Sequence, residues 1–313
     1  MKAFYCDRFV LPLPSGHRFP MTKYSRLRAR VADELEAVAL VEPEAATEGQ
    51  LALAHAPEYI ERVMTGTLEA AEIRAIGFPW SPEMVERSRR SVGATIGACR
   101  AAVDDGVAVN LAGGTHHAQH DRGAGYCVFN DAAVAARVIQ ADAARMRRQL
   151  RLAIIDLDVH QGDGTAQIAS SDDSVFTLSL HGARNFPFRK QASDLDVALP
   201  DGTEDETYLA ALDTALAQML QRFSPQFIIY LAGADAHGGD RLGKLALTDD
   251  GMARRDRRVL DFAESLGVPI AVAMAGGYGR EIETTVALHL QTVRAACEAW
   301  RRRGRPRASE SAA

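Results

Sequence analysis

Short runs of apolar residues, each followed by polar residues and glycine, recur along the chain. Four of these runs occupy Val107–Ala112, Leu152–Ile155, Phe227–Ala232 and Pro269–Met274. Continuous apolar runs of this length are typical of strands that are buried on both faces of a parallel sheet. We therefore expect the four runs to be strands of one sheet.

The stretches between these runs have apolar residues at three- and four-residue spacing, which predicts helices. The clearest are Ala132–Leu150, Glu206–Gln221 and Asp249–Leu266. Strands that alternate with helices predict an α/β fold with a mostly parallel sheet flanked by helices on both faces. Length alone suggests about two domains, but no linker-like or charged block interrupts residues 1–300, so we expect one domain there.

Polar clusters follow all four predicted strands. They are Gly113–His117, Asp156–His160, Gly233–Asp240 and Ala275–Tyr278. Ligands of open parallel sheets bind beyond the carboxyl ends of the strands. The four clusters should therefore converge on one pocket at that edge of the sheet.

The second cluster has the spacing of a metal site. Alternate residues of an extended segment face the same way, so Asp158 and His160 can reach one divalent ion. A third carboxylate at Asp240 would complete a set of one nitrogen and two oxygen ligands, which leaves positions open and describes catalytic zinc. Iron(II) or cobalt would also suit these ligands. The alternative interpretation is a solvated turn, both for the segment with Asp158 and His160 and for the segment with Asp240.

The histidine pair and the tyrosine suggest the matching chemistry. A hydrolase needs a base for the attacking water and an acid for the leaving group. His116 and His117 could divide these roles if Asp156 and Asp163 hold them in different protonation states. Tyr278 could donate a hydrogen bond to a carbonyl oxygen as it becomes an oxyanion. Each of these residues could otherwise be an ordinary turn residue.

Charge and composition narrow the function classes. The formal net charge of −5 argues against a general affinity for nucleic acid or anionic membranes. No segment has the length of a membrane span or the form of a signal peptide, so we expect a cytoplasmic protein. The four cysteines are scattered, which indicates reduced thiols. The arginine-rich residues 301–313 are expected to be a disordered basic tail.

Taken together and in this order, the motifs resemble the zinc-dependent histone deacetylase family. The resemblance runs from about residue 15 to about residue 295 and is carried by Gly113–His117, Gly125–Asp131, Asp156–Gly164, Ser179–His181, Gly238–Asp240 and Gly276–Tyr278. The class IV branch and its bacterial relatives are most similar, on the basis of Gly202–Tyr208, His160–Gln161 and Gly239–Gly243. The resemblance implies the arginase/deacetylase fold, with the active site at the carboxyl edge of the sheet.

The resemblance also implies a role for each motif residue. The zinc ligands would be Asp158, His160 and Asp240. His117 would be the general base with His116 beside it, paired with Asp163 and Asp156 respectively, and Tyr278 would be the oxyanion donor. A structural potassium ion would be held by Asp156, Asp158, His160, Ser179 and the carbonyl of Leu180.

Substrate contacts follow from the same resemblance. Gly125, Tyr126 and Phe186 would line the tunnel for an acylated lysine, and Gly276 and Gly277 would leave space beyond the acyl carbonyl. The chain departs from class I members at the tunnel mouth. Gly77–Ser81 offers no carboxylate there to hold the backbone of a substrate.

These observations predict a zinc-dependent amidohydrolase that removes acyl groups from lysine ε-amines of proteins or peptides. A deacylase of acyl-polyamines or other small amines is an alternative. A two-manganese ureohydrolase of the same fold is another, although the chain lacks an evident second set of ligands. A binding module without turnover is a third, although the complete set of site residues argues against it.

Overall fold

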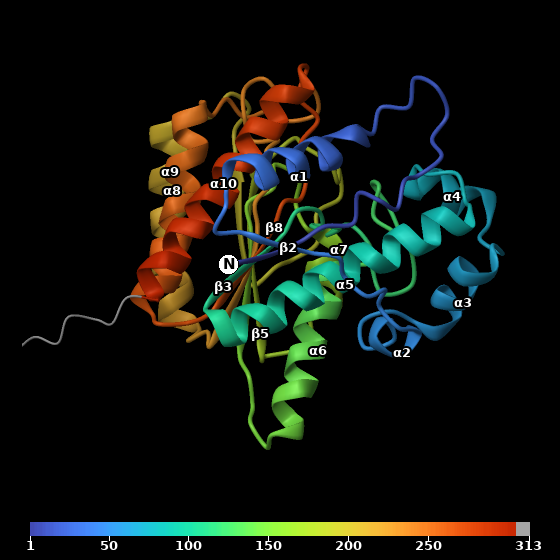
Figure 1. The fold of residues 1–313 in the computed structure, drawn as a ribbon, viewed down its shortest axis with the longest axis horizontal. Coiled ribbons are helices and arrows are strands. Elements are labelled where there is room, and N and C mark those ends of the chain that lie inside the picture. Colours follow the sequence, from blue (N-terminus) through green and yellow to red (C-terminus); the bar gives the residue numbers. More distant parts are fainter. Residues whose placement is uncertain (305–313) are drawn as a thin grey trace, which may run out of the picture.

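A computed structural model describes residues 1–304 of the chain (Figure 1). The strands are β1 (Lys2–Phe4), β2 (Ala39–Val41), β3 (Val107–Asn110), β4 (Leu152–Asp156), β5 (Val175–Gly182), β6 (Leu195–Leu199), β7 (Phe227–Leu231) and β8 (Ile270–Ala273). The helices are α1 (Thr22–Glu34), α2 (Glu48–Leu51), α3 (Pro57–Thr65), α4 (Ala70–Ile76), α5 (Pro82–Asp105), α6 (Asp131–Arg145), α7 (Asp163–Ala169), α8 (Asp205–Arg222), α9 (Asp249–Ser265) and α10 (Ile282–Arg303).

All strands of this part of the chain form one parallel sheet in the order β2-β1-β3-β8-β7-β4-β5-β6. The predicted α/β fold class is confirmed. The four strands predicted from apolar runs are β3, β4, β7 and β8, and they are neighbours in the middle of the sheet. Their carboxyl ends therefore meet in one place, as the clusters of polar residues predicted.

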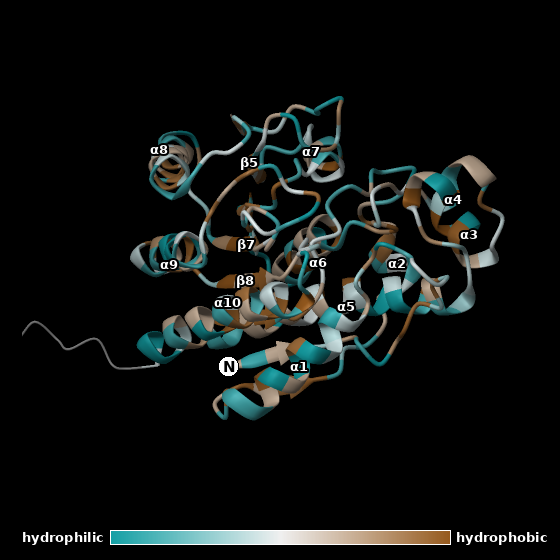
Figure 2. Cartoon of the chain, turned by 90° about the horizontal axis from the view of Figure 1, so that it is seen from above, coloured by the Kyte–Doolittle hydropathy of each residue, from teal (hydrophilic) through white to brown (hydrophobic). Residues whose placement is uncertain are grey.

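The sheet is buried on both faces, and strand β7 shows how. Ile228 and Tyr230 belong to the core beneath α1, α8, α9 and α10, whereas Phe227, Ile229 and Leu231 face the core beneath α5 and α6. This alternation is the period of two of an extended chain. Figure 2 shows the apolar strands β7 and β8 between the helical layers. The short helices α2, α3 and α4 lie to one side, next to α5 and α6 (Figure 1).

Helix α10 extends past the predicted end of the domain. Its last turn contains Arg301, Arg302 and Arg303, so the prediction of disorder from residue 301 is wrong for these residues. Arg302 forms ion pairs of 2.7 Å with both Asp261 and Glu264 of α9. Cations in the last turn of a helix also interact favourably with the helix dipole. The remainder of the predicted tail, 305–313, lies outside the described residues.

None of the helices within residues 1–304 is both long enough and apolar enough to cross a membrane.

A buried ion pair joins α9 to the sheet. Arg255 is completely buried, and its guanidinium lies 2.7 Å from the carboxylate of Asp256. The Asp256 carboxylate also accepts hydrogen bonds of 2.5 Å from the hydroxyl groups of Tyr230 in β7 and Thr292 in α10. Arg255 in turn donates to the backbone carbonyls of Leu157 and Gly233, which follow β4 and β7.

This pair yields a stability prediction. Asp256→Asn keeps the shape of the side chain but leaves the buried Arg255 without a counter-charge, so the free energy of unfolding should fall by about 3–5 kcal/mol. Asp213→Asn is a suitable control because Asp213 is an exposed partner of Arg258 at 2.9 Å, and its loss should change stability by at most about 1 kcal/mol. Urea denaturation of both variants measures the difference. Equal effects would contradict a special role for the buried pair.

Candidate active site

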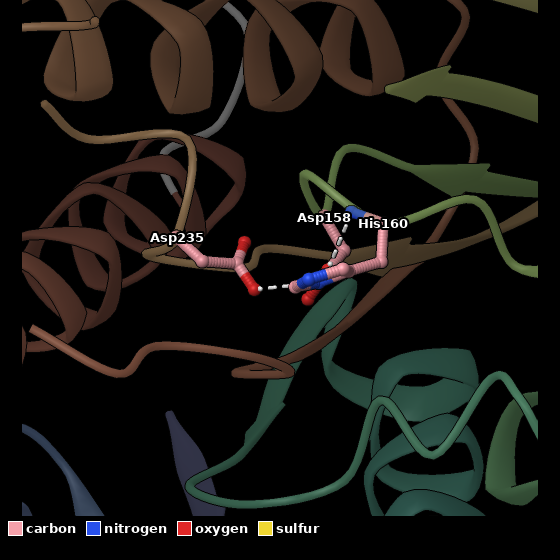
Figure 3. A group of neighbouring side chains, drawn as sticks. All are labelled: Asp158, His160 and Asp235. Atoms are coloured by element: carbon pink, nitrogen blue, oxygen red, sulfur yellow. Dashed lines mark hydrogen bonds and ion pairs between the residues drawn. The ribbon is translucent and has the colours of Figure 1, made fainter. Parts of the chain in front are cut away.

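Three side chains converge at the carboxyl ends of β4 and β7: Asp158, His160 and Asp235. One ligand atom from each lies within 4.8 Å of the others, and all three side chains are buried. His160 Nδ1 is 2.9 Å from Asp158 Oδ1 and 3.3 Å from Asp235 Oδ2. Figure 3 shows both carboxylates directed toward the imidazole ring.

This group fits a divalent cation. Asp235 Oδ2 is buried and has no hydrogen-bond donor, whereas Asp235 Oδ1 accepts from the backbone N–H of Val159 at 3.0 Å. Asp158 Oδ2 accepts from the N–H of Gly276 at 2.8 Å. Asp158 Oδ1 also accepts from the backbone N–H of His160 at 3.0 Å, so backbone groups fix both oxygens of Asp158 and one oxygen of Asp235. Two carboxylates and one imidazole are the kind of ligand set that zinc and iron(II) accept in catalytic sites.

The pKa values show how strongly the group attracts positive charge. Burial and the neighbouring Asp158 raise the pKa of Asp235 to about 7. Burial alone would lower the pKa of His160, but the carboxylates of Asp158 and Asp235 outweigh it and raise that pKa to about 10. The protein alone therefore retains a proton at the point where the three side chains meet. A bound divalent ion would take its place.

Asp240 does not join this group, which corrects the predicted ligand set. Its carboxylate accepts backbone hydrogen bonds from Leu242 at 2.7 Å, Gly243 at 2.9 Å and Tyr278 at 2.6 Å. It therefore shapes its own turn and ties that turn to the loop after β8. Asp235 lies closer to the end of β7 and takes the predicted place of the third carboxylate.

The two neighbouring histidines are held by different carboxylates, in the pairing that the family resemblance implied. His116 Nδ1 lies 2.6 Å from Asp156, and His117 Nδ1 lies 2.6 Å from Asp163. Burial lowers the pKa of His117 to about 4, assisted by the charge on His116. Burial also opposes the charged form of His116, but Asp156 and Asp158 outweigh it and raise its pKa to about 9. At neutral pH one ring is thus neutral and the other protonated.

Asp131, which was not predicted as a site residue, positions the loop that carries these histidines. This fully buried carboxylate at the start of α6 accepts from the backbone N–H groups of Gly114 at 2.9 Å and Thr115 at 2.7 Å. Gly113 and Gly114 have φ angles of +81° and +69°, a conformation that glycine adopts without strain. The glycines therefore allow the turn, and Asp131 holds it in place.

Tyr278 lies on the loop after β8, where a second unpredicted residue supports it. The ammonium group of Lys23, a buried residue of α1, is 3.3 Å from the carbonyl oxygens of both Ala275 and Gly277. It is also 5.4 Å from the centre of the Tyr278 ring. Burial holds the pKa of Tyr278 well above its usual value. The phenol is therefore a hydrogen-bond donor at neutral pH.

A cavity of about 320 Å³ leads to these groups. Four of the predicted substrate residues line it, namely Gly125, Tyr126, Phe186 and Gly276. The Phe186 ring lies 4.8 Å from the His117 ring, centre to centre. A side chain at position 125 would come within 2.7 Å of His117, so glycine is required there. Gly277 does not line the cavity, and its role is in the contact with Lys23.

The residues predicted to hold potassium come from the neighbouring strands β4 and β5 and from the loop after β4. Asp156 of β4 is the neighbour of Ser179 in β5, and Leu180 follows in the same strand. The hydroxyl group of Ser179 is hydrogen-bonded to His181 Nδ1 at 2.9 Å. Potassium binding itself stays a prediction.

Comparison with known proteins decides the family. The model of the histone deacetylase domain matches residues 17–293. The chain belongs to the histone deacetylase family. It is 32% identical to histone deacetylase 2 of Arabidopsis thaliana over 282 residues, which cover 87% of this chain and 72% of the relative. It is 42% identical over 298 residues to an uncharacterized protein of Picosynechococcus, covering 95% and 98% of the two chains.

Solved structures of histone deacetylase homologues share the fold. A homologue complexed with SAHA has a TM-score of 0.79 and 25% identity, with 94% of this chain and 83% of that one covered. A homologue from Aquifex aeolicus has a TM-score of 0.78 and 25% identity over the same shares. This histone deacetylase family member is accordingly a deacetylase-like hydrolase.

The site generates a prediction about metal content. The purified protein should carry about one divalent ion per chain, and Asp235→Asn should weaken metal binding by more than about a hundredfold, which exceeds the usual loss from supporting residues. Asp240→Asn should retain the ion, since its carboxylate contacts only backbone groups. Elemental analysis and calorimetric titration with zinc measure both effects.

The opposite result for the two variants would restore Asp240 as the third ligand. Two tightly bound manganese ions per chain would favour the ureohydrolase alternative instead.

Proposed function

We propose that this protein is a metal-dependent deacylase that removes acyl groups from lysine ε-amines of proteins or peptides. One observation carries the proposal. His116, His117 and Tyr278 line the same cavity as the buried group of Asp158, His160 and Asp235. This arrangement provides a candidate base, acid, oxyanion donor and metal site around one point.

A divalent ion bound by Asp158, His160 and Asp235 would polarise the amide carbonyl and make water more acidic. Zinc is the ion that the family resemblance implies, and iron(II) or cobalt would also fit these ligands. Residues of the chain supply the remaining chemistry. Tyr278 donates a hydrogen bond to the carbonyl oxygen, which becomes negatively charged when the carbonyl carbon is attacked.

The histidine pair moves the protons. His117 is neutral, so its free ring nitrogen can accept a proton from the attacking water while Asp163 holds the ring in position. The resulting charge lies beside Asp163 and is stabilised by it. When the carbon–nitrogen bond breaks, a protonated histidine of the pair delivers a proton to the departing amine. His116, held protonated by Asp156, favours the developing negative charge throughout.

The alternatives are less well supported. Within residues 1–304, the group formed by Asp158, His160 and Asp235 is the one cluster of His, Cys, Asp and Glu side chains with metal-binding geometry, and a ureohydrolase would need ligands for two ions. A binding module without turnover would have no need of two histidine–carboxylate pairs beside a phenol. Deacylation of an acyl-polyamine would need the same chemistry, so only the substrate distinguishes this alternative from the proposal.

Three further parts of the proposal rest on the sequence. Potassium would bind at Asp156, Asp158, His160, Ser179 and Leu180. The class IV branch is the most similar, and a cytoplasmic location without nucleic-acid or membrane partners is expected.

The proton and oxyanion roles can be tested by substitution. His117→Ala removes the base, and Tyr278→Phe removes one donor while it keeps the ring, so each should lower kcat by about a hundredfold or more. Turnover of an acetyl-lysine peptide by zinc-loaded protein gives the rates. Metal content and thermal unfolding should stay close to those of the wild type. Near-normal turnover by either variant would exclude the assigned role.

The acyl group that the pocket accepts is a separate prediction. Each methylene that the pocket buries contributes about 0.8 kcal/mol, and a second cavity of about 40 Å³ adjoins the first at Phe19, Tyr24 and Tyr126. We therefore expect acyl-lysines longer than acetyl to be hydrolysed at least as well as acetyl-lysine. Values of kcat/KM for acetyl, butyryl, octanoyl and myristoyl peptides test this. A steep fall beyond acetyl would indicate a short, closed pocket.

A further inference from the structure

An exposed arginine, Arg74, lies at the entrance of the cavity. It belongs to α4 (Ala70–Ile76) and lines the cavity together with Tyr126. The carbonyl of Ala75 accepts a 2.9 Å hydrogen bond from the N–H of Gly125, and that of Ile76 accepts one of 2.7 Å from Tyr126. The end of α4 is thus fixed to the loop that forms the tunnel wall. This attachment places Arg74 beside the opening.

The guanidinium of Arg74 is not needed by the helix that carries it. Glu72 forms a 2.9 Å ion pair with Arg62, and Glu69 caps the first turn of α4. The carbonyl of Ile73 in the last turn accepts from the N–H of Gly77 at 2.9 Å. Within residues 1–304, Arg74 has no ion pair and its side chain makes no hydrogen bond. Its charge is therefore available to a bound molecule.

No carboxylate balances this charge along the cavity wall. The carboxylates that line the cavity are Asp158 and Asp235, and both are buried in the candidate metal group. The formal net charge of the whole chain is −5. A cation at the entrance is therefore opposite in sign to the average of the molecule, and it lies where the substrate must pass.

We propose that Arg74 determines substrate specificity by favouring acylated lysines that have a carboxylate nearby. An acidic residue next to the acyl-lysine would provide this carboxylate. A guanidinium binds carboxylates through a planar pair of N–H donors, and it repels ammonium groups. The inference rests on the proposed deacylase function and makes it more specific, because it disfavours polycationic substrates such as acylated polyamines.

The test is a series of acetyl-lysine peptides that differ only in the two residues flanking the lysine, which are both Glu, both Gln or both Lys. The zinc-loaded full-length protein should have a kcat/KM about two- to fivefold higher for Glu than for Gln, as expected for one exposed charge pair, and lower still for Lys. The difference should arise mainly in KM, because the contact lies outside the reacting atoms. It should shrink when sodium chloride is raised from about 50 to about 500 mM. Acetylated spermidine should be a poor substrate.

Variants at position 74 identify the source of the preference. Arg74→Gln should abolish the Glu-over-Gln ratio, Arg74→Lys should keep most of it, and Arg74→Glu should reverse the order in favour of Lys. Arg148→Gln is the matched control. Arg148 is also exposed, but it precedes β4 and so lies toward the opposite edge of the sheet. That control should leave the ratio as in the wild type.

Binding of fluorescent versions of the three peptides separates this inference from the proposed function. If no peptide is hydrolysed but the Glu peptide binds most tightly and loses this advantage in Arg74→Gln, the deacylase proposal fails and the charge selection stands. If all peptides are hydrolysed equally, or the preference persists in Arg74→Gln, the inference is overturned and the deacylase proposal stands.

Discussion

The structure of the site depends on the burial of negative charge at the carboxyl edge of the sheet. Asp156, Asp158, Asp163 and Asp235 lie around one point and are each at most 4% exposed. Isolated carboxylates are not stable in such surroundings, so each must have a positive or hydrogen-bond-donating neighbour. The imidazole rings of His116, His117 and His160 meet part of this need. A divalent ion would meet the remainder. The buried negative charge would then account both for metal binding at the site and for the contacts that stabilise this edge of the sheet.

Two buried cations contact the loops that surround the charged group, and both do so through backbone carbonyls. Arg255 donates to the carbonyls of Leu157 and Gly233, next to the candidate ligands of β4 and β7. Lys23 lies 3.3 Å from the carbonyl oxygens of Ala275 and Gly277, beside Tyr278. Both side chains therefore fix the loops that carry the site residues and add positive charge near the carboxylates. They come from helices far apart in the sequence, so the packing of α1 and α9 on the sheet determines the geometry of the site.

Sequence patterns predicted the centre of the molecule better than its periphery. The strands β3, β4, β7 and β8 are apolar runs in which the polar residues, Asn110 of β3 and Asp156 of β4, stand at the carboxyl end, and this pattern is typical of buried parallel strands. Strand β6 alternates exposed and half-buried residues at the edge of the sheet, and β1 and β2 have three residues each, so they carry weak signals. Within the site, the spacing of Asp158 and His160 was enough to predict that their side chains lie together, because both residues follow the end of one strand. Asp235 and Asp240 share a single loop, and only its folded path determines which of them turns inward. Lys23 had no local signal, because its role depends on contacts with residues more than 200 positions away.

The position of Asp240 gives a physical role to the Gly-Asp-Arg segment that the sequence had suggested as a ligand source. Asp240 accepts from the backbone N–H of Tyr278 at 2.6 Å, and the Nε of Arg241 donates to the carbonyl of Tyr278 at 2.9 Å. Both polar groups of the Tyr278 backbone are therefore held by neighbouring residues of one loop. This arrangement matters because the preceding Ala275 has a φ of +53°, a conformation that costs a non-glycine residue roughly 1–2 kcal/mol. The contacts from Asp240, Arg241 and Lys23 together oppose relaxation of this segment. The segment thus fixes the position of the Tyr278 phenol in the cavity.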